Sequence, residues 1–135
     1  MQHVPVTPTQ ISSVSPFLII RDLSESLLFY RDALGFEVTY SAPADDPFFA
    51  VVRRDGVEFM LKVSANDIPP KPNPGRHPWA PWDAFIYTPD PDALAAELDS
   101  KSVPFSKPLA DTEDGLRGFE LTDPNGYVFF CGKVR

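Results

Sequence analysis

The order of predicted elements indicates an α+β fold built from two similar halves. Each half of the 135-residue chain reads as a strand, a helix and then three strands. A proline-rich stretch at 69–81, PPKPNPGRHPWAP, separates the halves and is unsuited to a helix interior or a central strand. The length fits a single domain with its own core. We therefore expect one domain, with module one at about 11–66, an extended connector at about 67–81 and module two at about 82–133.

In the first half, an apolar run at 14–21 predicts a strand. A helix follows, with Ser24 as the expected N-cap, leucines at helical spacing and Gly35 as its end. The alternating segment 36–41 predicts a second strand. Two further strands, at 48–53 and 57–63, are joined by an Asp55-Gly56 turn, which is a hairpin signal.

The second half repeats this order. A strand is expected at 82–88, and Asp90-Pro91 begins a helix that runs to about Ser100. A short strand is expected at 103–105. The last two strands, 116–122 and 127–132, form a hairpin around the Asn125-Gly126 pair.

Charge and composition exclude several function classes. The chain has 12 basic and 19 acidic residues, a net charge of −7, which argues against a nucleic-acid partner. No run of 18 apolar residues predicts a membrane span, and the N-terminus lacks the features of a secretory signal, so a cytoplasmic protein is expected. The single cysteine, Cys131, excludes a disulfide framework and is expected to be a buried thiol facing the helix.

Three segments in order carry a resemblance to a known family. These are SPFLIIRDLSESLLFYRDALGFEV, WDAFIYTPDPDALAAEL and LTDPNGYVFF. Together they resemble the vicinal oxygen chelate superfamily over about residues 11–132. That superfamily includes glyoxalase I, extradiol dioxygenases, fosfomycin-resistance enzymes and bleomycin-resistance proteins. The resemblance implies two βαβββ modules that form a curved mixed sheet around a cavity, and a homodimer.

Enzymes of this superfamily bind a divalent metal in the cavity through His and Glu side chains. By the resemblance, the ligand positions of this chain hold Ser15, Met60, Asp83 (or Trp82, if Pro89 adds a bulge) and Phe130. Glu58 shares strand parity with Met60. Because a single carboxylate does not hold a catalytic metal, we expect no metal ligands, no catalytic residues and no cofactor.

The cavity face is instead expected to be apolar and aromatic. Side chains alternate between the faces of a strand. The candidate ligand-binding residues are Phe17, Ile19, Met60, Trp82, Asp83, Phe85, Tyr87 and Phe130. Aromatic rings of this kind bind drug-like or cationic ligands, but they also serve as ordinary core packing.

Three functions follow from this pattern. The first is a metal-independent small-molecule binding protein resembling the bleomycin-resistance branch, with a cationic or aromatic antibiotic as ligand. The alternative is a glyoxalase- or dioxygenase-like enzyme with an atypical metal site, or with Glu58 or Asp83 as a lone base. The third is a structural or regulatory partner whose cavity is filled by its own aromatic side chains.

Overall fold

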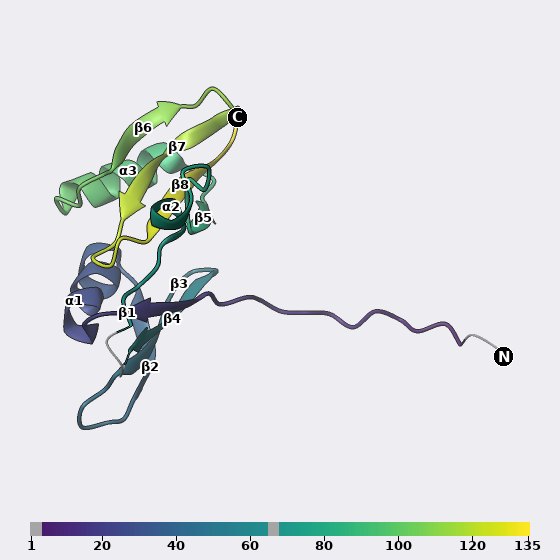
Figure 1. Cartoon of the computed structure of the whole chain (residues 1–135). Coiled ribbons are helices and arrows are strands. Elements are labelled where there is room, and N and C mark those ends of the chain that lie inside the picture. The colour runs from purple at the N-terminus through teal and green to yellow at the C-terminus, as the bar shows by residue number, and fades with distance from the viewer. Residues whose placement is uncertain (1–3, 65–67) are drawn as a thin grey trace.

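The computed structural model describes residues 4–64 and 68–135, and it contains two four-stranded sheets (Figure 1). The strands of the first sheet, in the order β1-β4-β3-β2, are β1 (Phe17–Ile20), β2 (Glu37–Ala42), β3 (Phe49–Arg54) and β4 (Val57–Val63). The strands of the second, in the order β5-β8-β7-β6, are β5 (Ala84–Tyr87), β6 (Lys107–Asp111), β7 (Leu116–Thr122) and β8 (Val128–Val134). In the first sheet β1 runs parallel to β4, and in the second sheet β5 runs parallel to β8. The other neighbouring pairs are antiparallel. The predicted α+β fold with two similar modules is confirmed; residues 65–67, where the first module was expected to end, lie outside the described part.

Each module has one main helical segment between its first and second strands. In module one, α1 (Leu23–Leu27) continues into a π-helical stretch, η1 (Leu28–Ala33), and Gly35 follows with a φ of +76°. The predicted Ser24 cap was wrong: the cap is Asp22, whose extended backbone lets its carboxylate accept from the Glu25 N–H at 3.1 Å. In module two, α3 (Pro91–Ser100) begins after Asp90 as expected, and the Asp90 carboxylate accepts from the Ala93 N–H.

Two expectations about connecting segments were wrong. The predicted strand at 103–105 is absent, because the Val103 N–H donates to the Leu98 carbonyl at the end of α3 and Pro104 has no N–H to give. Strand β6 begins instead at Lys107, opposite Glu120. The connector is not wholly extended either, since it contains a helical turn, α2 (Asn73–Arg76), with Pro74 in the first turn, where an N–H has no intrahelical partner.

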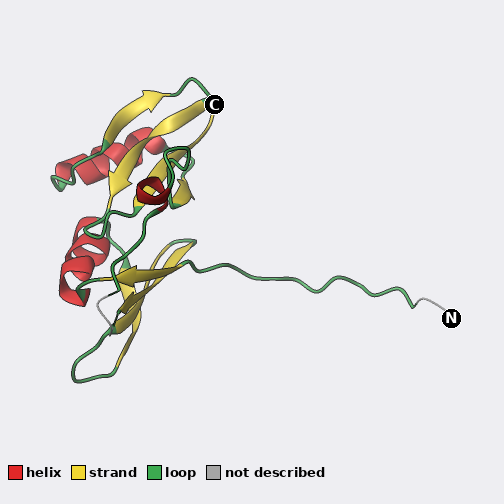
Figure 2. Cartoon of the chain, in the orientation of Figure 1, coloured by secondary structure: helices red, strands yellow, loops and turns green. Residues whose placement is uncertain are grey.

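The two main helical segments lie on one side of the two sheets. In Figure 2, α1 and α3 stand on one side of the two sheets, and residues 4–16 run away from the body on the other side as an extended N-terminal arm. The predicted first strand was too long at its start, since β1 begins at Phe17, although the Pro16 carbonyl still accepts from the Met60 N–H of β4.

The two modules share one hydrophobic core. The ring of Tyr30, from η1, is fully buried and lies 5.7 Å from the ring of Phe59 in β4 and 6.2 Å from that of Phe129 in β8. Cys131 is buried in the same cluster, as expected. The shared core fixes the modules against each other and so fixes the surfaces that lie between and beside them. Among the described residues, no helix is both long enough and apolar enough to cross a membrane.

Candidate functional site

Each sheet has one face that its helix does not cover, which we call the helix-free face. In β1 the burial alternates as predicted: Leu18 and Ile20 are 8% and 1% exposed, while Phe17 and Ile19 are 55% and 36% exposed. The predicted residues Phe17 and Ile19 therefore lie on the helix-free face of module one. Met60 is paired with Phe17 across β1 and β4, so it lies beside that ring.

An aromatic cluster occupies the helix-free face of module two. The rings of Trp82 and Phe85 lie 5.5 Å apart, each lies within 5.2 Å of the Phe130 ring, and the Tyr87 ring lies 4.3 Å from that of Phe85. Phe130 is buried in this cluster, whereas Tyr87 is exposed. The structure thus brings together four of the predicted residues, with Phe130 as the packed base and the other rings above it.

Two glycines that the sequence reasoning missed make room for this cluster. Gly118 and Gly132 face each other across β7 and β8. A Cβ on either glycine would lie within 2.7 Å of Cε1 of the Phe130 ring. The signal in the sequence is a glycine in the interior of each strand, which often marks a close approach of another group.

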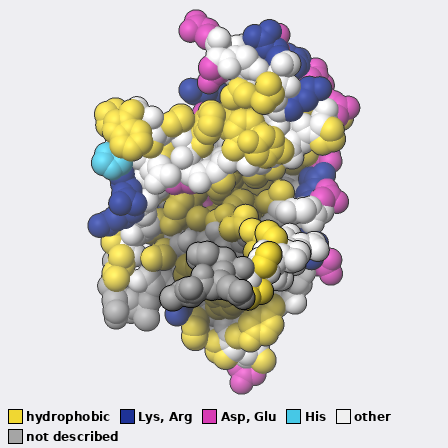
Figure 3. Space-filling view, turned by 90° about the vertical axis from the view of Figure 1, so that its right-hand side faces the viewer, with side chains coloured by type: hydrophobic (Ala, Val, Ile, Leu, Met, Phe, Trp, Pro, Cys, Tyr) yellow, Lys and Arg dark blue, Asp and Glu magenta, His cyan; other side chains and the backbone are white. Residues whose placement is uncertain are grey.

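Module one carries a second, smaller aromatic group on its helix-free face. The centroid of the Phe17 ring lies 6.2 Å from that of Phe49, and the two rings are stacked. The Tyr40 ring lies 6.1 Å from the same Phe49 ring. Sequence reasoning did not select Phe49 or Tyr40. Figure 3 shows apolar side chains gathered across the face from which the N-terminal arm projects, with most charged side chains at its margins.

The two candidate carboxylates have partners within the chain. The Ser15 hydroxyl donates to the Glu58 carboxylate, and this bond ties the base of the N-terminal arm to β4. Asp83 accepts from the Asn73 N–H at 2.7 Å with one oxygen and from the Val128 N–H at 2.8 Å with the other. Asp83 therefore holds the connector against the start of β8.

The residues at the superfamily's metal positions do not fit a divalent metal. Met60 offers only a weak thioether and Phe130 offers no ligand atom, while both oxygens of Asp83 are bound to backbone N–H groups. Within residues 4–64 and 68–135, no group of three or more His, Cys, Asp or Glu side chains is placed to hold a metal ion.

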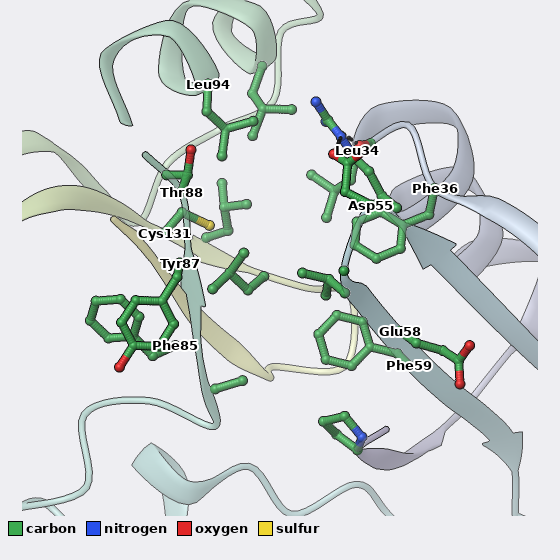
Figure 4. Close-up of a pocket in the computed structure, with 18 of the residues that line it drawn as sticks. Leu34, Phe36, Asp55, Glu58, Phe59, Phe85, Tyr87, Thr88, Leu94 and Cys131 are labelled. Carbon is green, nitrogen blue, oxygen red and sulfur yellow. Dashed lines mark hydrogen bonds and ion pairs between the residues drawn. The ribbon is translucent and has the colours of Figure 1, made fainter. Parts of the chain in front are cut away.

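A cleft of about 600 Å³ lies between the modules (Figure 4). Of the predicted site residues, Phe85 and Tyr87 border it, but their rings point to the far side of β5, away from the space between the strands. Glu58 likewise points away from the cleft on the other side, whereas Phe59 points into it. The helix-free faces and the cleft are therefore distinct surfaces that meet along the strands β4 and β5.

Burial shifts the proton affinities of groups near the junction of the modules. Desolvation raises the pKa of the Cys131 thiol to about 12, so the thiol stays protonated at neutral pH. Burial also raises the pKa of the Asp123 carboxyl, although Tyr30 and the backbone of Tyr127 and Asn125 donate hydrogen bonds to it. Both groups are buried, and Cys131 also lines the cleft from β8 (Figure 4).

Comparisons with known proteins agree with this architecture. The bleomycin-binding protein from the bleomycin-producing Streptomyces verticillus, solved with copper(II)-bleomycin, is 23% identical with a TM-score of 0.66, and the match covers 95% of this chain and all of that one. TioX from Micromonospora sp. ML1 is 16% identical with a TM-score of 0.70, covering 92% of this chain and all of that one. TnmS3, an antibiotic binding protein from Streptomyces sp. CB03234, is 20% identical with a TM-score of 0.69, covering 95% of this chain and all of that one.

Sequence comparison is informative at the level of the family. No curated protein shows significant sequence similarity to the chain. The model of the Glyoxalase/Bleomycin resistance protein/Dioxygenase superfamily matches residues 10–129, which is nearly the whole chain. The chain therefore belongs to the glyoxalase/bleomycin resistance protein/dioxygenase superfamily.

Proposed function

We propose that this protein binds an aromatic, cationic small molecule on its helix-free faces without the help of a metal. The observation that carries the proposal is the set of open aromatic rings on these faces: Phe17 in module one, and Trp82, Phe85 and Tyr87 in module two. At the positions where the superfamily's enzymes carry metal ligands, Met60 offers a weak thioether and Phe130 no ligand atom, which supports binding without a metal. The solved bleomycin-binding and antibiotic-binding relatives support a binding role on this fold.

The chemistry of the faces favours a flat ligand that carries positive charge. Aromatic rings supply rigid apolar area for stacking, and cations are attracted to the ring faces. Glu58 lies on the helix-free side of β4, and the net charge of −7 attracts cations to the molecule as a whole. Met60 and Ile19 complete an apolar floor on module one.

We also propose that the protein is a homodimer in which a second copy covers these faces. In one chain the side chains on the two helix-free faces diverge, since Glu58 points away from one side of the cleft and Phe85 and Tyr87 from the other (Figure 4). Each face alone gives a ligand a single wall. A second copy supplies the opposite wall and also buries the apolar side chains of the arm, among them Val6, Ile11 and Val14, which are exposed in the single chain.

The test combines binding with assembly. Metal-free bleomycin and thioflavin T, a flat cationic dye, are titrated into the protein by calorimetry, and sedimentation velocity gives the mass. We expect saturable binding of one or both probes well below about 1 mM and a mass of two chains. Binding of neither probe up to that concentration contradicts the binding proposal, and a mass of one chain at the titrated concentration contradicts the dimer.

A further inference from the structure

The two modules meet at two equivalent junctions, and one of them is filled. There the turn between β7 and β8 packs against β1 and the helical segment of module one. Asp123 accepts from the Tyr30 hydroxyl at 2.7 Å, and Asn125 Oδ1 accepts from the Arg21 N–H at 2.9 Å. The Tyr127 hydroxyl donates to the Ile19 carbonyl at 2.7 Å. This turn therefore closes its side of the boundary between the modules.

At the other junction, the turn between β3 and β4 approaches β5 and α3. This turn consists of Asp55 and Gly56 only, and the Asp55 side chain is 93% exposed, so it does not reach inward. Its main tie to module two is the ion pair of Arg54 with Glu97 at 2.8 Å. The cleft of about 600 Å³ lies at this junction, where the short turn leaves space that its counterpart fills.

The interior of the cleft is made of hydrocarbon side chains from both modules. Module one contributes Leu34, Phe36, Val57 and Phe59, and module two contributes Ile86, Leu94, Leu98 and Leu121. Arg54 lies at the edge, where its guanidinium is neutralised by Glu97 and also donates to the Leu34 carbonyl at 2.9 Å. A charged ligand would lose its hydration in the cleft without gaining a free partner of opposite charge. A neutral ligand has no such desolvation cost.

We propose that this cleft is a second binding site, which takes one neutral, largely hydrocarbon molecule. The site goes beyond the binding of cationic ligands on the helix-free faces, and both of its walls come from one chain. Its volume lies within the range of small-molecule sites, which are mostly apolar concavities between structural units. The base of the N-terminal arm borders the cleft through Val14 and Pro16, but Val14 is exposed and the rest of the arm leads away from the body (Figure 1), so the arm leaves the cleft open.

Two dyes with the same body and different charge provide the test. N-phenyl-1-naphthylamine is neutral, and 8-anilino-1-naphthalenesulfonate adds a sulfonate to the same ring system. Both become fluorescent in apolar surroundings. With the wild-type protein we expect the neutral dye to bind at one molecule per chain and at least about tenfold more tightly than the sulfonate. Absence of saturable binding of the neutral dye, or equal affinity for both dyes, overturns the proposal.

Variants locate the bound dye. Leu94 points into the cleft in Figure 4, so Leu94→Trp should reduce the affinity for the neutral dye about tenfold or more. Leu28→Trp, at an exposed position on η1 that does not line the cleft, should leave it unchanged. Phe17→Ser, on the helix-free face, should also leave it unchanged while weakening the binding of thioflavin T. Loss of the neutral dye in Phe17→Ser, with retention in Leu94→Trp, places the dye on the helix-free face and overturns the proposal.

Nuclear magnetic resonance of the wild-type protein with the neutral dye locates the dye without relying on variants that must fold. Intermolecular nuclear Overhauser effects from the naphthyl protons are expected at the methyl groups of Leu94 and Ile86. Effects confined to the methyl groups of Ile19 and Met60 contradict the cleft site. If thioflavin T binds but the neutral dye does not occupy the cleft, the proposed function stands and only this inference fails.

Discussion

At the residue scale, Asp123 shows how burial and hydrogen bonding oppose each other. The carboxylate accepts from the Tyr30 hydroxyl and from two backbone N–H groups, and these bonds favour the charged form. Desolvation nevertheless outweighs them and raises its pKa above the ordinary value. Asp123, at the junction between the modules, therefore holds its proton more tightly than an exposed aspartate does.

This shift predicts a pH dependence of stability. Between the unfolded and the raised folded pKa, the folded state holds more of the Asp123 proton, so the contribution of this group to the free energy of unfolding falls as pH rises through that interval. The difference in unfolding free energy between wild type and Asp123→Asn should become less favourable to wild type over the same interval and stay constant above it. Urea unfolding of both proteins from pH 4 to pH 8 measures this difference. A difference that shifts in favour of wild type as pH rises contradicts the assignment.

Trp82 is the residue whose ring tests the aromatic site most simply. Its ring is half-buried and contacts Phe85 and Phe130, so Trp82→Phe keeps an aromatic group while removing stacking area. We expect a threefold to tenfold loss of affinity for thioflavin T, on the order of 1 kcal/mol, with a cooperative unfolding transition retained. Trp79→Phe is a matched control, because Trp79 is exposed and stacks on His77 in the connector. Unchanged affinity in Trp82→Phe removes this ring from the site.

At the element scale, the hairpin of β7 and β8 depends on its two interior glycines. A methyl group at Gly132 would lie 2.4 Å from the Arg117 carbonyl oxygen and 2.7 Å from the Phe130 ring. Gly132→Ala should therefore lower the free energy of unfolding by about 1–3 kcal/mol, because both the backbone and the ring must shift. Gly75→Ala is the control, since a Cβ there meets no atom within 4 Å. Chemical denaturation measures both, and equal stabilities contradict the packing described for Phe130.

The elements were predictable where a local pattern decides them. The Asp55-Gly56 and Asn125-Gly126 turns were sufficient to place two hairpins, and the apolar run at 14–21 was sufficient to place β1. The failures lie where two local signals compete. Ser24 was a plausible cap, but Asp22 has the same capping chemistry and the extended backbone. Residues 103–105 have strand-like side chains, yet the end of α3 takes the Val103 N–H.

At the scale of the whole molecule, the helix-free faces were predictable and the cleft was not. The faces follow from strand parity, which is a local property of Phe17, Ile19, Phe85 and Tyr87. The cleft depends on how the β3–β4 turn meets α3 about 40 residues later in the chain, as the Arg54–Glu97 pair shows. The residue pattern of neither segment indicates how close the β3–β4 turn comes to α3. Gly118 and Gly132 do carry a local signal, a glycine in the interior of each strand, but that signal does not identify the Phe130 ring for which they make room.

The shared core also explains why two separate surfaces arise on so small a chain. Tyr30 and its neighbours bind the modules together on the side of the β7–β8 turn, and this attachment leaves the opposite junction open. The same arrangement turns the two helix-free faces away from each other (Figure 4). A second copy and a ligand would then cover faces that one chain exposes.

The central claim is that binding on the helix-free faces needs no metal, and one calorimetric comparison tests it most directly. Thioflavin T and metal-free bleomycin are titrated into protein that has been treated with a chelator, and again into protein supplemented with Zn²⁺, Ni²⁺, Mn²⁺ or Fe²⁺. We expect saturable binding of a probe in the chelator-treated sample and an affinity that the added metals leave unchanged. Binding that appears only with a metal, at about one ion per chain, would contradict the account.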